Sequence, residues 1–241
     1  MKSKSLVVIT GASSGIGSAT AKLFSHHGYP LLLVARRFER LEALALPRTM
    51  IAPVDISDSP KFVKAIGDAE AEFGPVGALV NNAGTMMLGH IESQDPAEWD
   101  QMFQVNVMGL LRCTRVVLKG MLERKSGTII NISSIAGRKT FPNHAAYTGT
   151  KFAVHGISES IREEVAGSNV RVTTIAPGAV ETELLSHTTS DQIRDSYEDW
   201  KTSIGGALRS EDVAQSILFA YSQPQSVCVR EIVIAATRQG P

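Results

Sequence analysis

A tyrosine and a lysine four residues apart form the pair in this chain best suited to chemistry. Tyr147 and Lys151 make a Y-x-x-x-K pattern in a segment with helical periodicity, so both side chains should lie on one helix face. A free phenol has a pKa of about 10, and use as a base near neutral pH requires a fall of about 3 units, or about 4 kcal/mol. One ammonium about 4 Å away supplies on the order of 4 kcal/mol at an effective dielectric constant of about 20. The pair therefore fits proton transfer, although the same spacing also occurs in exposed helical pairs.

A glycine-rich turn near the N-terminus is the second chemical feature. It follows a short apolar run, precedes a helical stretch and has the spacing G-x3-G-x-G. Glycine permits a tight turn and a close approach of the backbone, and the free N–H groups of a helix N-terminus favour an anion. The turn therefore predicts a site for a dinucleotide pyrophosphate, whereas on its own it would also fit a purely structural role. The expected cofactor contacts are Gly11, Ser13, Ser14, Gly15, Ile16 and Gly17.

Two arginines after the second apolar run bear on the identity of the cofactor. Arg36 and Arg37 stand where an acidic residue would otherwise accept hydrogen bonds from the adenosine ribose. Arginine binds phosphate through paired, charge-assisted hydrogen bonds, so the pattern predicts NADP(H) over NAD(H). The alternative is a solvated helix start in which Glu39 is the partner of the arginines. Asp55 either reaches the adenine amino group or caps the helix that begins near Asp58.

The elements that must position these residues alternate between short apolar runs and longer helical stretches, which is typical of a parallel sheet built from βαβ units. The predicted strands are 6–10, 30–35, 50–54, 78–81, 128–133, 170–175 and 231–234. The predicted helices are 15–27, 37–45, 58–73, 96–124, 144–167 and 210–222. This order predicts an α/β fold of the Rossmann type, a doubly wound parallel seven-stranded sheet with helices on both faces in a three-layer αβα sandwich. All strand-to-helix turns should then meet at the carboxyl edge of the sheet.

Length and composition indicate one Rossmann domain over residues 1–241, with a polar, less regular substrate lid near 181–206. Of the 241 residues, 43% are hydrophobic, and 24 Lys+Arg balance 24 Asp+Glu, so we expect neither a nucleic-acid nor a membrane partner. No apolar run is long enough to span a bilayer. Cys113 and Cys228 lack a CxxC spacing, which indicates free thiols and a cytoplasmic location. The histidines show no metal-ligand spacing, so no metal is expected.

Polar motifs also follow the later predicted strands. The fourth is followed by Asn81-Asn82-Ala83-Gly84, the fifth by Ser133-Ser134, and the sixth by Pro177-Gly178-Ala179-Val180-Glu181-Thr182. With the glycine-rich turn and the Tyr/Lys pair, these ordered motifs closely resemble the short-chain dehydrogenase/reductase (SDR) family over residues 5–235. The resemblance implies an NADP(H)-dependent oxidoreductase that moves a hydride between the nicotinamide and a small carbonyl or alcohol, such as an aldehyde, a ketone, or a short hydroxy or keto acid.

The resemblance also implies catalytic roles. The family places a serine 13 residues before the tyrosine, which is Ser134 here, so Ser133 is interpreted as a hydrogen-bonding residue at the strand end. Asn106 matches the family's catalytic asparagine, which holds a water linked to the lysine, with a helix-bending asparagine as the alternative. Tyr147 would exchange a proton with the substrate oxygen. Lys151 would lower the pKa of this tyrosine and bind the ribose hydroxyls.

Further cofactor contacts are implied at the later strand ends. Asn82, Ala83 and Gly84 should lie beneath the adenosine ribose, where Asn82 also braces the sheet. The loop residues expected to orient the nicotinamide and the diphosphate are Pro177, Gly178, Val180 and Thr182.

Assembly and substrate are less constrained by the sequence. The family usually pairs its long helices, here 96–124 and 144–167, into homodimers or homotetramers. Arg194 in the lid could hold a substrate carboxylate. Two alternatives stay open: an epimerase that uses the nicotinamide only transiently, and a non-catalytic NADP(H)-binding regulatory protein. The latter need not keep Ser134, Tyr147 and Lys151 together.

Overall fold

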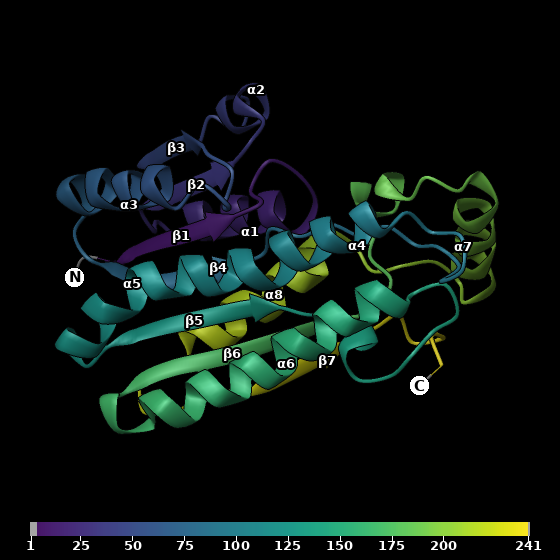
Figure 1. The fold of residues 1–241 in the computed structure, drawn as a ribbon. Coiled ribbons are helices and arrows are strands. Elements are labelled where there is room, and N and C mark those ends of the chain that lie inside the picture. Colours follow the sequence, from purple (N-terminus) through teal and green to yellow (C-terminus); the bar gives the residue numbers. More distant parts are fainter. Residues whose placement is uncertain (1–3, 241) are drawn as a thin grey trace.

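The computed structural model describes residues 4–240, in which seven parallel strands form one sheet with helices on both faces (Figure 1). The spatial order of the strands is β3-β2-β1-β4-β5-β6-β7. This order confirms the predicted doubly wound Rossmann-type fold. The strands are β1 (Leu6–Thr10), β2 (Leu31–Ala35), β3 (Thr49–Pro53), β4 (Val76–Asn81), β5 (Gly127–Ile132), β6 (Val170–Pro177) and β7 (Glu231–Ile234).

Helices cover the sheet in two layers. The α-helices are α1 (Gly15–His26), α2 (Phe38–Glu42), α3 (Ser59–Phe73), α4 (Pro96–Phe103), α5 (Leu110–Arg124), α6 (Ala145–Val165), α7 (Asp191–Ser203) and α8 (Ser210–Ser222). Short turns of other helical types are η1 (Gln104–Gly109), η2 (Ile135–Gly137), η3 (Ala166–Ser168) and η4 (Glu183–His187). Helices α3, α5 and α6 pack on one face, and α1 and α8 pack together on the other. The carboxyl ends of the strands point toward the side of the molecule where α7 lies (Figure 1).

The central strands are buried on both faces, which explains their uninterrupted apolar sequences. In β1, Leu6 and Val8 pack into the core beneath α3 and α5, whereas Val7 and Ile9 pack into the core beneath α1 and α8. All four side chains are 0% exposed. Within the part of the chain that the structure describes, no helix is both long and apolar enough to cross a membrane.

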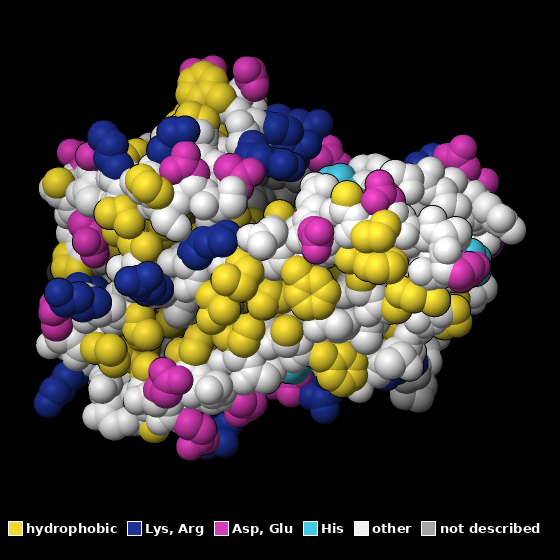
Figure 2. All heavy atoms as spheres, in the orientation of Figure 1, with side chains coloured by type: hydrophobic (Ala, Val, Ile, Leu, Met, Phe, Trp, Pro, Cys, Tyr) yellow, Lys and Arg dark blue, Asp and Glu magenta, His cyan; other side chains and the backbone are white. Residues whose placement is uncertain are grey.

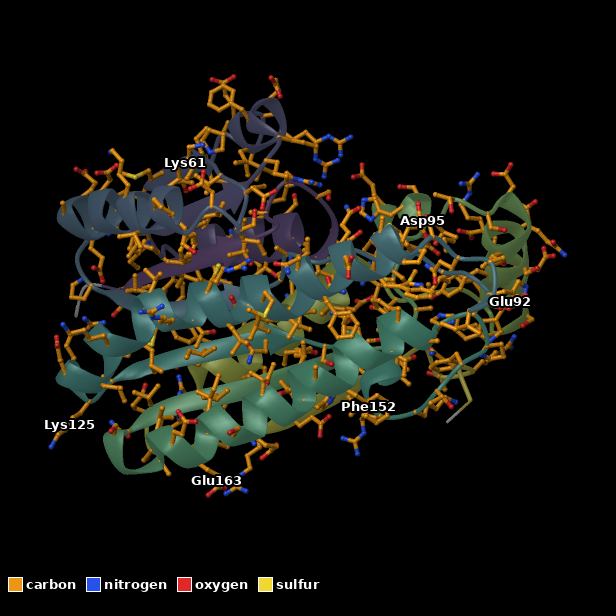
Figure 3. The ribbon with its side chains drawn as sticks, in the orientation of Figure 1. Lys61, Glu92, Asp95, Lys125, Phe152 and Glu163 are labelled. Atoms are coloured by element: carbon orange, nitrogen blue, oxygen red, sulfur yellow. The ribbon has the colours of Figure 1, made fainter. Side chains whose placement is uncertain are left out.

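The single helix predicted over residues 96–124 is divided into three parts. Helix α4 begins after Asp95, whose side chain accepts a hydrogen bond from the Ala97 N–H at 2.9 Å, and it ends at Phe103 (Figure 3). The π-helical turn η1 follows before α5 begins. Asn106 in this turn accepts a hydrogen bond from the Thr85 N–H and donates one to the Thr85 carbonyl, both at 2.9 Å. The π-helical turn thus places the Asn106 side chain against Thr85, a buried partner in the loop after β4.

The segment 181–206 is more regular than the sequence analysis predicted, because it contains η4 and the 13-residue helix α7. The Ser190 hydroxyl accepts a hydrogen bond from the Ile193 N–H at 3.4 Å and so caps the start of α7. Ile193, Tyr197 and Trp200 recur at helical spacing and line one cavity. Because the remaining positions of α7 are polar, the sequence analysis did not recognise its narrow apolar face as part of a helix.

A glycine substitution in α1 tests the close packing between this helix and the β1 turn. A Cβ at Gly17 would lie 2.3 Å from the Gly11 carbonyl oxygen and 2.6 Å from Asn82 Nδ2, so Gly17→Ala should lower the free energy of unfolding by about 1–3 kcal/mol. Gly67 lies on the exposed side of α3, and a Cβ added there would have no atom within 4 Å. Gly67→Ala should therefore raise the free energy of unfolding by about 0.5–1 kcal/mol. Urea denaturation measures both. Equal stability of the two variants would contradict the packing described.

Candidate active site

A cavity of about 620 Å³ opens at the carboxyl edge of the sheet, within the size range of small-molecule sites. Its walls come from the loops after β1, β2, β3, β4, β5 and β6, together with η4 and parts of α6 and α7. It brings together the predicted residues Gly11, Ser13, Ser14, Gly15, Ile16, Arg36, Arg37, Asp55, Asn82, Ala83, Gly84, Ser134, Tyr147, Lys151, Pro177, Gly178, Val180 and Thr182. Gly17 and Asn106 lie behind this lining and contact residues that form it.

Tyr147 lies in the first turn of α6 and faces the end of β5. Its side chain is 5% exposed and is hydrogen-bonded to the Ser134 side chain. The Ser134 hydroxyl accepts a hydrogen bond from the Ala136 N–H at 3.0 Å, which leaves its own proton available for another partner. Burial raises the pKa of Tyr147 and the nearby Tyr197 adds to this rise, whereas the hydrogen bond from Ser134 opposes it. The phenol therefore keeps its proton at neutral pH.

Lys151 lies one helical turn further along α6 and is also buried. Its Nζ donates a hydrogen bond to the Ile132 carbonyl at 3.0 Å and lies 5.6 Å from the centre of the Tyr147 ring. Burial lowers the pKa of Lys151 to about 8. The sequence analysis predicted that this ammonium would lower the pKa of the phenol; in the structure burial raises the pKa of Tyr147, and the effect of Lys151 on it stays a prediction. Removal from water disfavours the charged form of each group.

The carbonyl of Lys151 is held by a chain of side chains that reaches β7. The Ser133 hydroxyl donates to this carbonyl at 3.2 Å and lies 2.9 Å from His155 Nδ1. His155 Nε2 in turn lies 3.0 Å from a Glu231 carboxylate oxygen. Ser133 is thus a hydrogen-bonding residue at the end of β5, as the sequence analysis interpreted it. The other two partners carried no local signal, because His155 and Glu231 are far apart in sequence.

Asn106 connects the loop after β4 to α6. Besides its two bonds to Thr85, its Nδ2 donates to Thr150 Oγ1 at 3.1 Å, and Thr150 Oγ1 donates to the Tyr147 carbonyl at 2.7 Å. The side chain therefore braces the helix that carries Tyr147. A π-helical turn between α4 and α5 carries Asn106, and its proposed role in holding a water stays a prediction.

Asn82 fixes the glycine-rich turn to the end of β4. Its Nδ2 donates to the carbonyls of Thr10 at 3.0 Å and Gly11 at 3.2 Å, and its backbone N–H donates to Thr10 Oγ1 at 3.1 Å. These bonds give Asn82 the bracing role that the sequence analysis expected.

Arg37 is the centre of a polar cluster at the other end of the cavity. Its guanidinium donates to Ser13 Oγ at 3.0 Å, to Ser14 Oγ at 2.8 Å and to Glu183 Oε2 at 2.8 Å. Glu183 also pairs with Arg40, and the hydrogen bonds from the two guanidiniums hold the pKa of Glu183 at about 2. The acidic partner of Arg37 is therefore Glu183 of η4, where the alternative sequence interpretation named Glu39.

The sequence left two roles open for Asp55, contact with the adenine or capping of α3, and the structure gives the capping role to Asp58. The Asp58 side chain caps α3 by accepting a hydrogen bond from the Lys61 N–H at 3.2 Å. Asp55 lines the cavity and accepts a hydrogen bond from the Ser57 N–H at 2.8 Å. Asp55 is therefore not the cap of α3, and its place in the cavity lining leaves contact with the adenine amino group as its predicted role.

Several residues of the cavity wall were missed by the sequence analysis. Around Tyr147 these are Met86, Leu88, Phe141, His144, Leu184, Leu185, Ile193, Tyr197 and Trp200. Gln239, close to the C-terminus, also lines the cavity and accepts a hydrogen bond from the Ala179 N–H at 3.0 Å. Arg194 was expected to face the substrate, but its guanidinium donates to the Thr188 carbonyl at 2.7 Å and pairs with Asp191 outside the cavity lining.

Among residues 4–240, no group of three or more His, Cys, Asp or Glu side chains is arranged to hold a metal ion.

Comparison with known proteins identifies relatives that match this chain over nearly their whole length. The family model of short chain dehydrogenases matches residues 5–193. An uncharacterised oxidoreductase of Staphylococcus saprophyticus is 39% identical over 97% of this chain and 96% of its own length, and one of Listeria monocytogenes is 35% identical over 97% of both. Among solved structures, the closed form of a serine dehydrogenase complexed with NADP+ superposes with a TM-score of 0.90, at 30% identity over 98% of this chain and 96% of that one.

The buried Lys151 should make stability depend on pH in a defined window. Its pKa is about 8 in the folded protein and about 10.4 in the unfolded chain, so the unfolded chain binds more protons between these values. The free energy of unfolding, relative to that of Lys151→Met, should therefore rise by about 1–3 kcal/mol from pH 8 to pH 10. Urea denaturation at each pH measures this difference. The exposed Lys22→Met is the control, and a difference for Lys151→Met that is constant with pH would contradict the assigned pKa.

Proposed function

Because the chain belongs to the short-chain dehydrogenase family, we propose that this oxidoreductase uses NADP(H) to move a hydride between the nicotinamide and a small carbonyl or alcohol substrate. The predicted substrates are aldehydes, ketones, and short hydroxy or keto acids. One observation carries the proposal: Tyr147, Ser134 and Lys151 line the same cavity as the glycine-rich turn. The similar serine dehydrogenase complexed with NADP+ supports the choice of cofactor.

The cavity end beside β1 and β2 fits a phosphorylated dinucleotide. A Cβ on Gly11 would lie 2.8 Å from the Ala83 Cα, so only glycine keeps this turn close to the β4 loop. The N-terminus of α1 would favour the diphosphate, and Thr182 lies beside it, 3.0 Å from the position of a Cβ on Gly15. Arg36 and Arg37 would hold the 2′-phosphate through charge-assisted hydrogen bonds. The Arg37 guanidinium is already paired with the Glu183 carboxylate, so a bound phosphate would have to displace Glu183 from this pair.

Tyr147 and the residues around it would transfer a proton to or from the substrate oxygen. When bound, the nicotinamide supplies or accepts the hydride. Ser134 would donate a hydrogen bond to the substrate oxygen and stabilise the charge that develops there. In reduction Tyr147 would pass its phenolic proton to this oxygen, and in oxidation it would take the proton back. Lys151 would bind the ribose hydroxyls, and Asn106 would keep α6 in place and hold the water that the family links to the lysine.

The segment 181–206 would act as the substrate lid, because η4 and α7 form the outer wall of the cavity. Both segments contribute apolar residues beside Tyr147. A wall on separate helical turns can open and close without disturbing the sheet.

A homodimer or homotetramer is the assembly we propose. Hydrophobic side chains gather on the outer surface of α4, η1 and α6 (Figure 2). Phe103 is 41% exposed, Met108 39% and Phe152 45%, and Phe152 lies on the outer side of α6 (Figure 3). A second set on α8 and β7 includes Phe219 and Val233. Exposed apolar patches of this kind commonly mark protein interfaces. We also propose a cytoplasmic location, because Cys113 and Cys228 are both free thiols.

Tyr147→Phe tests the proposed acid. The substitution removes the hydroxyl and keeps the ring, so NADPH should still bind with an unchanged Kd while kcat for carbonyl reduction falls by about 100- to 10,000-fold. NADPH fluorescence measures binding, and loss of absorbance of NADPH measures turnover across a panel of aldehydes, ketones, quinones and keto acids.

The same assay separates the alternative functions. Net consumption of NADPH by the native protein excludes an epimerase that returns the hydride to its substrate, and it excludes a regulatory protein that only binds the cofactor. Native kcat in Tyr147→Phe would refute the assignment of the acid.

Two opposite substitutions test the phosphate site. Arg37→Ala should weaken NADPH binding by about tenfold or more, because charge-assisted hydrogen bonds to the phosphate are lost, and should leave NADH binding nearly unchanged. Glu183→Gln removes the internal competitor of the phosphate, so NADPH should bind several-fold more tightly with little change for NADH. Titration calorimetry with both cofactors gives the four dissociation constants. Parallel changes for NADPH and NADH in either variant would show that these residues do not recognise the phosphate.

A further inference from the structure

The wall of the cavity beside Tyr147 is a row of aromatic side chains. The ring of His144 lies 6.3 Å from that of Tyr147 and 6.2 Å from that of Tyr197, and the Tyr197 ring lies 5.2 Å from that of Trp200. Phe141 flanks His144 at 5.4 Å. We call His144, Tyr197, Trp200 and Phe141 the aromatic row. It runs from the proposed acid outward to α7.

The rest of this wall is aliphatic. Met86 and Leu88 follow β4, Leu184 belongs to η4, and Ile193 begins the inner face of α7. Met86, Leu88 and Ile193 are at least 92% removed from solvent and pack in one cluster with Tyr147. The surroundings of the reacting oxygen are thus apolar on several sides.

The charged groups near this wall are already engaged. Lys201 lines the cavity, but its Nζ lies 2.7 Å from Glu198 and 3.2 Å from Glu181. Arg194 pairs with Asp191 outside the lining. Burial lowers the pKa of His144, so this ring is neutral at physiological pH. Apart from Lys151, whose Nζ donates to the Ile132 carbonyl, the described residues of this wall offer a substrate carboxylate no cation that is not already paired. A carboxylate here would therefore lose its hydration with little compensation.

We propose that the substrate is a neutral carbonyl compound with an aromatic or bulky apolar group, which packs on the aromatic row while its oxygen faces Tyr147 and Ser134. The inference rests on the proposed function and narrows its substrate class by setting hydroxy and keto acids aside. Aromatic groups pack favourably against such rings in offset or edge-on contacts. In the reduction, the carbonyl carbon gains the hydride of NADPH and the oxygen gains the proton of Tyr147, so the products are the alcohol, NADP+ and the Tyr147 phenolate, which regains its proton from water.

Four ketones separate the effects of ring and charge. Phenylacetone and phenylpyruvate share the ring and differ by a methyl or a carboxylate, and butanone and pyruvate lack the ring. We expect kcat/KM for phenylacetone to exceed that for each of the other three by about tenfold or more. Keto acids are the more electrophilic ketones, so this order would reflect the site and not the intrinsic reactivity. A preference for phenylpyruvate or pyruvate, or for the cationic betaine aldehyde, would overturn the inference.

Substitutions in α7 test the row itself. Trp200→Ala should raise KM for phenylacetone by about tenfold, with KM for butanone and Kd for NADPH changed by less than about threefold. Asp195→Ala, on the exposed side of the same helix, should change none of these values. An unchanged KM for phenylacetone in Trp200→Ala, with NADPH binding intact, would refute the aromatic row as the substrate site.

The two proposals fail in different ways. If native protein binds NADPH and reduces no ketone or aldehyde, both the proposed function and this inference are wrong. If it reduces keto acids faster than phenylacetone, the oxidoreductase assignment stands and only the inference about the substrate class is wrong.

Discussion

The parallel register that holds β4 between β1 and β5 is the constraint on which the cavity depends. Ile9 pairs with Val80, and Asn81 pairs with Asn131, so the three strands end at one level. The glycine-rich turn, the loop before α4 and Ser134 therefore leave the sheet side by side. The register of β1 with β4 shifts once, between Leu6 and Val7, and is regular from Val7 to Ile9. A slip of one residue in that regular part would exchange the side chains that face the two cores.

That burial also decides the protonation of the proposed catalytic pair. Water is excluded from Tyr147 and Lys151 by the strand ends and by α6, and both groups are thereby driven toward their neutral forms. A neutral phenol is the form that can donate a proton, which suits carbonyl reduction. The sequence showed the spacing of the pair but not the loss of solvent around it, so it predicted the opposite direction for the pKa of Tyr147.

Features that depend on local sequence were predictable, and features that depend on distant contacts were not. The alternation of apolar runs and helices identified the sheet, and the motifs at the strand ends identified the residues that bring the glycine-rich turn, Ser134, Tyr147 and Lys151 to one cavity. The π-helical turn at Asn106 could not be predicted from local sequence, because the partner of Asn106 in it is the backbone of Thr85 in another loop. The pairing of Glu183 with Arg37 likewise spans 146 residues. For α7 a signal did exist, since Ser190 is a good capping residue and the apolar positions that follow keep helical spacing.

The two ends of the cavity differ in electrostatics, and η4 connects them. Arg36 and Arg37 make one end positive, which suits a polyanionic dinucleotide, whereas the aromatic row makes the other end neutral. Glu183 and Leu184 are neighbours in η4, yet the first pairs with Arg37 and the second belongs to the apolar wall. A phosphate that displaces Glu183 from Arg37 must therefore act on the same short turn that shapes the wall beside Tyr147. Cofactor recognition and the form of the substrate site are in this way joined by two consecutive residues.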